Sequence, residues 1–397
     1  MKVIVTVDAR LYATPDGKVW CDNQFNFPHT FWQRYLVAFD EVEVVCRVVN
    51  VKSQHASWRE VTGERVTVHG LPFYLGPWQY LKNYWHTRRV IHQCIRPGQA
   101  YIFRVGSVLA DMLRPELVRR KLPYAVEVIG DPWDMFGPGG VTHPLRPIFR
   151  WWFTRQLKKV CQTAACGSYV TERLLQERYP APNATLTVSA SSIVLGDEAI
   201  APAPRQYELS DKARRLITVG SLEHPHKGVD LLIEAAALLQ KELPIELVIL
   251  GDGRMRGEFE ALARARKVSA QFLGTVPGGE AVRRLITEAD IFVLASRADG
   301  MPRAMIEAMA LGLFCVGSRV GGMQELLPAR WLAPMGDAAG LAKILKEGLT
   351  QPELMTKAAG ENWAKAKTYH QTILEKRRQA MYRELRRHVE EGFHGKA

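Results

Sequence analysis

The sequence lacks the features of a membrane-spanning, disulfide-bonded or zinc-clustered protein. No apolar run reaches the roughly 18 residues that a bilayer-spanning helix needs. The opening residues, MKVIVTVDAR, show neither the apolar core nor the cleavage site of a signal peptide. The six cysteines include no CxxC pair and no metal-ligand spacing. We therefore expect reduced thiols in a cytoplasmic protein.

The charge balance is strongly basic and predicts an acidic partner. The chain has 397 residues and a formal net charge of +12. Nucleic acid, anionic lipid and phosphorylated small molecules could all supply the opposite charge. No helix-turn-helix, RNA-binding or zinc module is visible in the sequence, so nucleic acid is not an expected partner.

Apolar segments alternate with helical patterns along both halves of the chain. This alternation predicts parallel sheets covered by helices, and the length predicts two domains. The expected strands cover 2–8, 41–49, 65–71, 100–105, 123–130, 215–222, 245–253, 270–276, 290–296 and 314–318, and the expected helices cover 78–94, 145–160, 228–243, 256–268 and 278–289. We therefore predict an α/β protein with two Rossmann-like, doubly wound domains that face a central cleft.

The domain boundaries follow from an Ala/Pro-rich linker at 191–209. We expect an N-terminal domain over 1–192 and a C-terminal domain over 193–370. A charged amphipathic helix over 371–397 is expected to cross back to the first domain.

The stretch DGMPRAMIEAMAL (299–311) places two acids around the start of an expected helix. Pro302 suits the first helical turn and Gly312 suits the stop. The free N–H groups near Gly300 would favour a phosphate or a sugar oxygen. Two interpretations remain open from this stretch. Asp299 and Glu307 could contact a ligand, or Asp299 could cap the helix and Glu307 could be an ordinary partly buried acid.

Other glycine turns follow neighbouring strands. VGSLEHPHKG (219–228) offers Gly220 for close approach to a ligand and Lys227 as a cation for phosphate. The turns GDGRMR (251–256) and FLGTVP (272–277) would leave room for a base and a ribose. The residues concerned are Gly251, Gly274, Thr275 and Val276. Plain loop glycines are the alternative interpretation of these last two turns.

The run SRADGMPRAMIEAMALGLFCVGSRVGGMQELL (296–327) resembles the signature of glycosyltransferase family 4. VGSLEHPHKGVDLLIEA (219–235) resembles the phosphate-binding unit of that family. The likeness is specific over 215–345, and over 1–190 it is mostly architectural. It implies a GT-B fold and retaining transfer of a hexose from a nucleotide-diphosphate sugar. The implied acceptor is a lipid-linked or growing saccharide in cell-surface polysaccharide synthesis.

The resemblance also implies roles for individual residues. Glu307 would hold the donor ribose, and Lys227 would neutralise the leaving diphosphate. Asp299 would bind hydroxyls of the transferred sugar. The remaining implied donor contacts are Gly220, Ser221, Gly300, Met301, Pro302 and Glu325. No metal or other cofactor is expected, because the sequence contains no Asp-x-Asp motif and the family needs no metal.

The sequence departs from the family pattern at two positions. Asp299 stands where the family usually has Glu, and Ser221 stands where it usually has Arg. The second change removes a charge-assisted contact to phosphate. The candidates to replace it are Arg297, Arg303 or a cation of the N-terminal, acceptor-side domain.

The N-terminal half offers candidates for the acceptor side. Asp131 follows an expected strand and could orient an acceptor hydroxyl, or it could cap its turn. The aromatics of FNFPHTFW (25–32) could line a sugar, or they could anchor the first helix. Arg104 could contact an anion, or it could form a surface ion pair.

The segment LRPIFRWWFTRQLKKV (145–160) concentrates basic charge. Helical spacing predicts one apolar face, formed by Leu145, Phe149, Phe153, Leu157 and Val160. The opposite arc carries Arg150, Trp151, Arg155 and Lys158. This arc is either a solvated face of a packing helix or a contact with an anionic membrane surface. The second interpretation predicts a peripheral protein at the inner face of the plasma membrane.

Two other classes of function remain open from the sequence. A GT-B epimerase or phosphorylase is one, although no lysine is singled out for a phosphorylase cofactor. A sugar-nucleotide-binding protein without turnover is the other.

Overall fold

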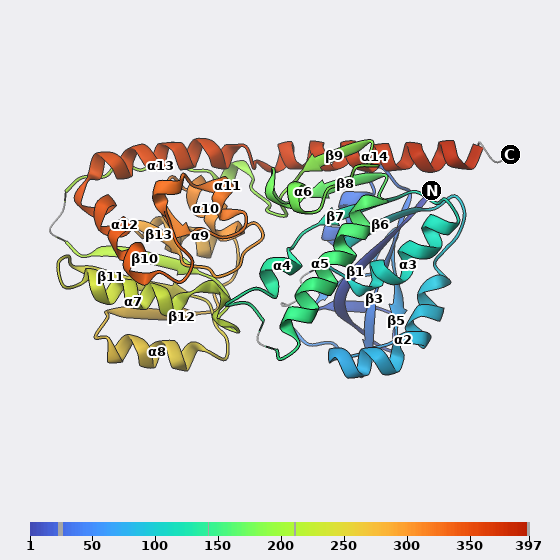
Figure 1. Ribbon diagram of the computed structural model, residues 1–397, viewed down its shortest axis with the longest axis horizontal. Coiled ribbons are helices and arrows are strands. Elements are labelled where there is room, and N and C mark those ends of the chain that lie inside the picture. The colour runs from blue at the N-terminus through green and yellow to red at the C-terminus, as the bar shows by residue number, and fades with distance from the viewer. Residues whose placement is uncertain (23–26, 142, 210–211, 395–397) are drawn as a thin grey trace.

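The computed structural model describes residues 1–22, 27–141, 143–209 and 212–394. Two α/β domains lie side by side, and the last two helices run along one edge of both (Figure 1). This is the predicted architecture of two Rossmann-like domains around a cleft.

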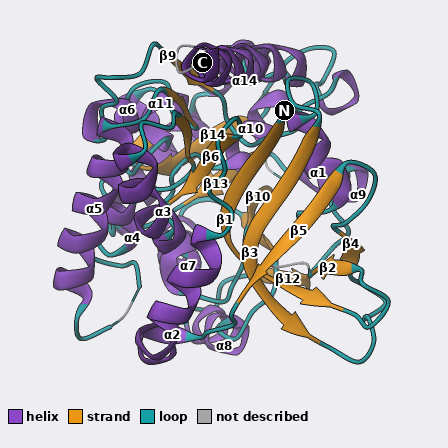
Figure 2. Cartoon of the chain, turned by 90° about the vertical axis from the view of Figure 1, so that its right-hand side faces the viewer, coloured by secondary structure: helices purple, strands orange, loops and turns teal. Residues whose placement is uncertain are grey.

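The N-terminal domain is built on a nine-stranded sheet. Its parallel strands follow the order β5-β3-β1-β6-β7-β8-β9, and the short β2 and β4 add an antiparallel corner beyond the end of β1. Figure 2 shows β1, β3 and β5 side by side. The strands are β1 (Lys2–Ala13), β2 (Val19–Cys21), β3 (Glu41–Asn50), β4 (Arg59–Glu60), β5 (Val66–Leu71), β6 (Ala100–Val105), β7 (Tyr124–Val128), β8 (Cys166–Tyr169) and β9 (Leu186–Ser189).

The C-terminal domain has a six-stranded parallel sheet with the order β12-β11-β10-β13-β14-β15. Its strands are nearly continuous apolar runs, because helices cover both faces. The strands are β10 (Arg214–Val219), β11 (Ile245–Leu250), β12 (Ala270–Gly274), β13 (Ile291–Leu294), β14 (Phe314–Ser318) and β15 (Leu332–Ala333).

Helices pack on both faces of each sheet. In the N-terminal domain they are α1 (His29–Trp32), η1 (Gln33–Tyr35), α2 (Gly76–His92), α3 (Val108–Arg119), α4 (Pro132–Met135), α5 (Arg146–Gln162) and α6 (Leu174–Arg178). The linker contains η2 (Asp197–Ala199). The C-terminal domain contains η3 (Pro225–Lys227), α7 (Val229–Leu239), α8 (Arg256–Ala265), α9 (Glu280–Thr287), α10 (Arg303–Ala310), α11 (Met323–Leu326), η4 (Ala329–Trp331), α12 (Ala338–Thr350) and α13 (Pro352–Lys367).

The final helix, α14 (Gln371–His394), packs on the N-terminal domain (Figure 1). Its Met381, Tyr382, Leu385 and Val389 join the apolar cluster on the β1/β3 face of the sheet. Helices α2, α3 and α5 cover the opposite face. One face of this sheet is therefore closed by residues near both ends of the chain, including Trp32, Tyr35 and α14.

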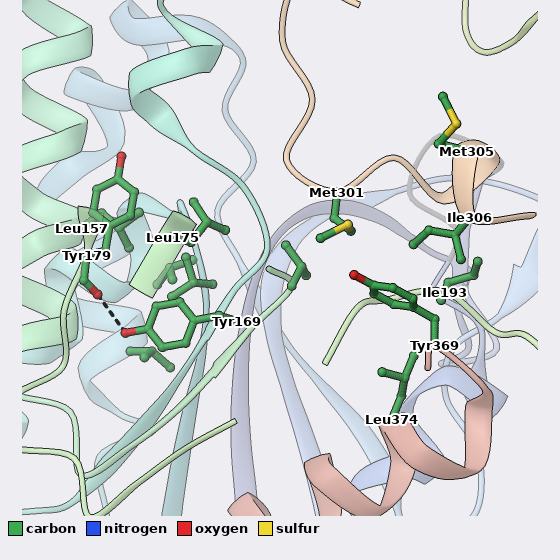
Figure 3. Packing of buried hydrophobic residues seen from close by; sticks show 14 of the residues in the cluster. Leu157, Tyr169, Leu175, Tyr179, Ile193, Met301, Met305, Ile306, Tyr369 and Leu374 are labelled. Carbon is green, nitrogen blue, oxygen red and sulfur yellow. Dashed lines mark hydrogen bonds between the residues drawn. The ribbon is translucent and has the colours of Figure 1, made fainter. Parts of the chain in front are cut away.

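A buried apolar cluster continues from one domain into the other. Figure 3 shows Tyr369, Leu374 and Ile193 from the crossings between domains in one cluster with Met301 and Ile306. On the N-terminal side of the same cluster, Tyr169 donates its hydroxyl hydrogen to the carbonyl of Tyr179 at 2.8 Å. The domains are thus joined by a shared core as well as by the chain.

The sheet order places the ends of particular strands at the cleft. In the C-terminal sheet β10 lies between β11 and β13, so the connections on its two sides leave in opposite directions. Ligands in such sheets bind where the strand order reverses, beyond the carboxyl ends of the strands. The loops after β10 and β13 are therefore the expected ligand loops.

One buried carboxylate links α14 to the N-terminal sheet. Glu127 on β7 accepts hydrogen bonds from the hydroxyls of Tyr35 and Tyr382, at 3.0 and 2.8 Å, and from Arg104. Burial alone would raise the pKa of Glu127, but Arg104 and the tyrosine hydroxyls outweigh it and hold the pKa below its usual value. Arg104 is therefore neither an anion contact in the cleft nor a surface ion pair.

Removing one donor from Glu127 should destabilise the protein. We predict that Tyr382→Phe lowers the free energy of unfolding by about 1.5–3 kcal/mol, because a hydrogen bond to a buried charge is lost. Denaturant unfolding monitored by circular dichroism measures the change. Tyr74→Phe is the matched control, because the Tyr74 hydroxyl is buried and has no hydrogen-bond partner. Equal stability of Tyr382→Phe and the wild type would contradict the prediction.

Candidate active site in the cleft between the domains

Two adjoining cavities occupy the cleft, with volumes of about 250 and 380 Å³. They share Asp131 and Asp134 of the N-terminal domain and Gly300 of the C-terminal domain. The first cavity is also lined by Arg150, Arg178, Arg297, Arg319, Gly321 and Gly322. The second is also lined by His224, His226, Lys227 and Asp299. Residues from both domains and from separate loops therefore meet at this site.

Asp299 and Lys227 form an ion pair at the mouth of α10. Lys227 Nζ lies 2.6 Å from Asp299 Oδ2, and both side chains are largely buried. Asp299 makes no capping hydrogen bond to the helix, so the capping interpretation is wrong. Pro302 occupies the N-cap and α10 begins at Arg303, one residue later than predicted. The expected stop is observed, because Gly312 follows Leu311 with a φ of 74°.

The turn that carries Asp299 is held by two glycines from the next loop. Gly322 N donates to the carbonyl of Gly300 at 2.9 Å. A Cβ on Gly321 would lie 1.7 Å from the carbonyl oxygen of Asp299, so no side chain fits there. Gly300 itself faces the backbone of Ile129 across the cleft, and an added Cβ would lie 3.4 Å from that carbonyl oxygen. These contacts fix the Asp299 turn against both domains.

Lys227 is placed by the turn between β10 and α7. Gly228 has a φ of 68°, and a Cβ there would lie 1.8 Å from the carbonyl oxygen of Ala295. The Lys227 side chain then runs over Gly220, where an added Cβ would lie 3.1 Å from Lys227 Cγ. Ser221 does not extend toward this cation, since its hydroxyl accepts from Glu223 N at 3.2 Å.

Glu307 lies on α10 and is mostly buried. Burial raises its pKa, and the nearby Arg303 and Arg283 act in the opposite direction. Arg283 belongs to α9, so Glu307 lies on the side of α10 that is close to α9. Glu307 is not among the residues that line the two cleft cavities.

The two glycine turns expected to hold a nucleotide lie at neighbouring strand ends. Gly251 N donates to the carbonyl of Gly274 at 2.9 Å, and Gly251 has a φ of 145°. Thr275 and Val276 follow Gly274 in the loop after β12, and β12 ends at Gly274 rather than at the predicted Val276. A Cβ on Gly251 would lie 1.9 Å from the carbonyl oxygen of Gly220, so the turns after β10 and β11 are in direct backbone contact.

Glu325, expected near the donor, reaches instead across to the N-terminal domain. Its carboxylate accepts hydrogen bonds from the backbone N–H groups of Glu172, Arg173 and Leu174 at 2.6, 3.0 and 2.7 Å. These groups lie at the start of α6. Glu325 therefore connects the domains directly, and its oxygen atoms are engaged in this structure.

Asp131 caps α4, as one of its two interpretations predicted. Its carboxylate accepts from Trp133 N at 2.9 Å and from the side chains of Arg178 and Tyr179. It also lines both cavities. Asp131 thus both caps α4 and lines the cleft.

The sequence interpretation missed several cleft residues. Arg178 and Arg319 line the first cavity, and His224 and His226 line the second. Burial and then the neighbouring Lys227 ammonium lower the pKa of His226, so this imidazole is neutral at pH 7. The signal for Arg319 was its position directly after strand β14. Arg178 gave no signal, because its place depends on an ion pair with Asp131, which lies 47 residues earlier in the sequence.

Arg297 and Arg303, two of the three candidates to replace the missing arginine, have different positions. Arg297 lies in the cleft, where it pairs with Asp230 at 2.8 and 2.6 Å and donates to the carbonyl of Pro225. Arg303 is exposed on the first turn of α10. Neither the ion pair of Arg297 nor the exposed position of Arg303 identifies a phosphate-binding arginine.

The basic helix α5 is largely as predicted. Leu157 and Val160 are buried, and Trp151, Arg155 and Lys158 are exposed. Leu145 is an exception to the predicted apolar face. It precedes the first helical turn and is 47% exposed. Arg150 turns toward the cleft, where its guanidinium lies 3.6 Å from the ring centre of Trp133.

The aromatic segment at 25–32 lies partly outside the described residues, which exclude Phe25 and Asn26. Phe27, Phe31 and Trp32 form a ring cluster, and Trp32 is buried. These rings pack together at the first helix. This arrangement agrees with the interpretation that they anchor the helix rather than line a sugar.

Within the described ranges, one group of side chains has the spacing of metal ligands. It consists of Glu43, His69 and Cys94. Glu43 already accepts from Lys2 at 3.2 Å. The group lies toward the amino-terminal ends of the parallel strands, away from the cleft.

Across the residues that the structure describes, no helix has both the length and the apolar character to cross a membrane.

Residues 213–351 match the family described as glycosyl transferases group 1. Protein CapJ of Staphylococcus aureus is 23% identical over 352 residues, and the alignment covers 86% of each chain.

Solved structures extend the similarity over the whole fold. WaaG, a glycosyltransferase involved in lipopolysaccharide biosynthesis, superposes with a TM-score of 0.63 at 16% identity, covering 96% of this chain and 99% of its own. HepE of Anabaena in complex with UDP-glucose superposes with a TM-score of 0.61 at 15% identity, covering 96% and 98%. The predicted GT-B fold is confirmed.

The match covers the loops that carry Lys227, Asp299 and Glu307, so the resemblance that those motifs suggested is confirmed as well. Residues 213–351 therefore form a group 1 glycosyltransferase domain, and the chain as a whole has the GT-B fold.

Proposed function

We propose that this chain transfers a hexose, with retention of anomeric configuration, from a nucleotide-diphosphate sugar to a hydroxyl of a saccharide acceptor. The observation that carries the proposal is the pairing of Lys227 with Asp299 at 2.6 Å in the cleft. It brings a phosphate-binding cation and a hydroxyl-binding carboxylate together where the strand order of the donor sheet reverses. The family match supports this assignment.

In this proposal the donor lies along the C-terminal domain. Its diphosphate lies between Lys227 and the backbone N–H groups of Gly300, Met301 and Arg303, which lie at the positive end of the α10 dipole. The donor sugar exchanges hydrogen bonds with Asp299. Its ribose lies toward Glu307, and its base lies over the turns that contain Gly251 and Gly274.

The proposed chemistry needs stabilisation of charge more than a protein nucleophile. Breaking the anomeric C–O bond places negative charge on the diphosphate and positive charge on the sugar. Lys227 and the backbone N–H groups stabilise the leaving diphosphate in a site partly closed to water. The acceptor hydroxyl attacks on the face of the leaving group and passes its proton to a donor phosphate oxygen. The absence of an Asp-x-Asp motif in the sequence supports a reaction without a metal.

The acceptor enters from the N-terminal side of the cleft. Asp131 keeps Arg178 at the cavity wall through their ion pair, and Arg150 and Arg319 complete a cationic lining. A phosphate-bearing acceptor suits such a lining better than a neutral one. We therefore propose a lipid-linked saccharide in cell-surface polysaccharide synthesis. The described role of WaaG in lipopolysaccharide biosynthesis supports this class of acceptor.

The exposed Trp151, Arg155 and Lys158 support peripheral binding at the inner face of the plasma membrane. Tryptophan among exposed cations is typical of helices that lie at the interface of anionic bilayers.

Incubation with a panel of UDP- and GDP-sugars tests the proposed function. Sugar transfer to a crude lipid extract, or slow donor hydrolysis, should appear with one donor class. The complex of HepE with UDP-glucose makes UDP-sugars the first choice. Binding of a donor without transfer or hydrolysis would instead identify a sugar-nucleotide-binding protein. Interconversion of the sugar nucleotide would identify an epimerase.

Loss of the Glu307 carboxylate should weaken donor binding. We predict that Glu307→Ala reduces nucleotide affinity by about 2–3 kcal/mol, because a charged hydrogen bond to the ribose is lost. Isothermal titration calorimetry with UDP and GDP measures the change. Glu361→Ala removes an exposed carboxylate from α13 of the same domain and should leave affinity unchanged. Unchanged affinity in a folded Glu307→Ala protein would remove Glu307 from the donor site.

Neutralising the exposed cations of α5 should weaken membrane binding. For the double substitution Arg155→Gln and Lys158→Gln we predict a loss of about 2 kcal/mol, near 1 kcal/mol per cation. Sedimentation with vesicles rich in phosphatidylglycerol measures it. Lys241→Gln with Lys357→Gln removes the same charge from exposed positions of the other domain. Equal sedimentation of the two double variants would leave α5 as an ordinary solvated helix.

A further inference from the structure

A large groove lies on the N-terminal domain, apart from the donor site. Its volume is about 760 Å³, which exceeds that of either cleft cavity. Helices α2 and α5 form its walls, and the start of α3 lies in its floor. The lining residues that the argument uses are Leu81 of α2, Phe136 after α4, and Ile148, Phe149, Trp152 and Phe153 around α5.

The groove lies where the N-terminal sheet reverses its strand order. Strand β1 pairs with β3 on one side and β6 on the other. The groove is lined by Asp8 of β1, by Tyr74 after β5 and by Val108 after β6. A crevice at such a point is the expected ligand site of a doubly wound domain. The same rule that places the donor in one domain therefore places a ligand here in the other.

The groove lies close to the cleft. Phe136 lies in its wall and stacks on Phe153, with 5.4 Å between ring centres. The residues just before it, Asp134 and Met135, line the cleft cavity that contains Lys227 and Asp299. A ligand in the groove therefore has one end separated from the reaction site by a single turn of chain.

The groove is lined mainly by aromatic and aliphatic side chains, which suits hydrocarbon rather than a hydroxylated sugar. Two acids reach it. Asp8 is paired with Arg47 at 2.6 Å. Burial raises the pKa of Asp111 to about 7, so this carboxyl carries only part of a charge at neutral pH. A phosphate would be poorly placed beside these two acids on the floor of the groove. It fits better at the end near the cleft, where Arg150 and Arg178 lie.

Apolar side chains and cations also surround the open side. Leu81 is 60% and Ile148 is 58% exposed at the two lips. On the same two helices, outside the residues that line the groove, the exposed Trp85 and Trp151 each have an arginine near the ring, Arg88 at 5.7 Å and Arg155 at 5.6 Å. Apolar lips flanked by tryptophan and arginine match a ligand that leaves a bilayer and carries an anionic head.

We propose that this groove holds the hydrocarbon chain of a membrane lipid phosphate that carries the acceptor saccharide, and that α4 directs its head group into the cleft. The proposal rests on the proposed function, since it names the acceptor of that same reaction. It adds a binding site for the lipid chain that lies outside the donor domain.

Geranylgeranyl phosphate below its micelle concentration is the probe, and dimethylallyl phosphate is its short-chain counterpart. Tryptophan fluorescence reports binding, because Trp152 lines the groove. We expect the long-chain phosphate to bind at least tenfold more tightly than the short one. The double substitution Leu81→Gln and Ile148→Gln should remove at least tenfold of that affinity. Both side chains are exposed, and glutamine adds no charge that could repel the phosphate.

Val118→Gln with Val194→Gln is the matched control, because it makes two exposed apolar positions outside the groove polar. It should bind geranylgeranyl phosphate like the wild type. Thermal midpoints of all variants show whether each protein is folded. Equal affinity for the long and short phosphates would overturn the proposal. Equal affinity of the groove variant and the control, or displacement of the probe by maltohexaose, would do the same.

The outcome is separable from that of the proposed function. A wild type that transfers sugar to a soluble saccharide but does not distinguish the two phosphates would refute the groove and keep the enzyme. A wild type with no turnover on any acceptor, yet with groove-dependent binding of geranylgeranyl phosphate, would refute the enzyme and keep the lipid site.

Discussion

The structure depends on one buried carboxylate, Glu127, and its three donors. Arg104 lies on the neighbouring strand β6, and Tyr35 lies near the N-terminus. Tyr382 lies in α14, 255 residues after Glu127 in the sequence. A buried charge without partners is strongly unfavourable, so separation of Glu127 from any one of its donors destabilises the fold. This requirement fixes α14 on the N-terminal sheet. It thereby fixes the start of α14 beside the linker, and with it the position of the donor domain over the acceptor domain.

Most of the fold could be predicted because its signals are local. Continuous apolar strands alternating with helices define both sheets, and the parallel arrangement places the strand ends at one edge. The proximity of the loops that carry Lys227 and Asp299 follows from this rule, since they come after the neighbouring strands β10 and β13. The ion pair between the two side chains was not predicted. Helix and strand ends were less well predicted. Helix α7 ends at Leu239 rather than at Leu243, because local pattern does not decide where the last turn unwinds.

The parts that sequence could not supply depend on contacts between distant segments. Glu325 was expected at the donor, but its carboxylate binds the start of α6 in the other domain. Arg178 enters the cleft because Asp131 holds it there. The groove is formed by α2 and α5, whose separate patterns show only two amphipathic helices. Each of these features is created when surfaces meet, and no periodicity in one segment encodes it.

The path of the chain sets how the two domains can move. The chain passes from the first domain to the second near Leu195 and returns near Gln371, and these two strands are hydrogen-bonded to each other at 2.8 Å. The two crossings between the domains therefore lie together at one point of the interface. The shared buried cluster, which includes Ile193, Tyr369 and Leu374, packs around the same point. A movement of one domain against the other would have to pivot about these crossings, because they are the covalent connections between the domains.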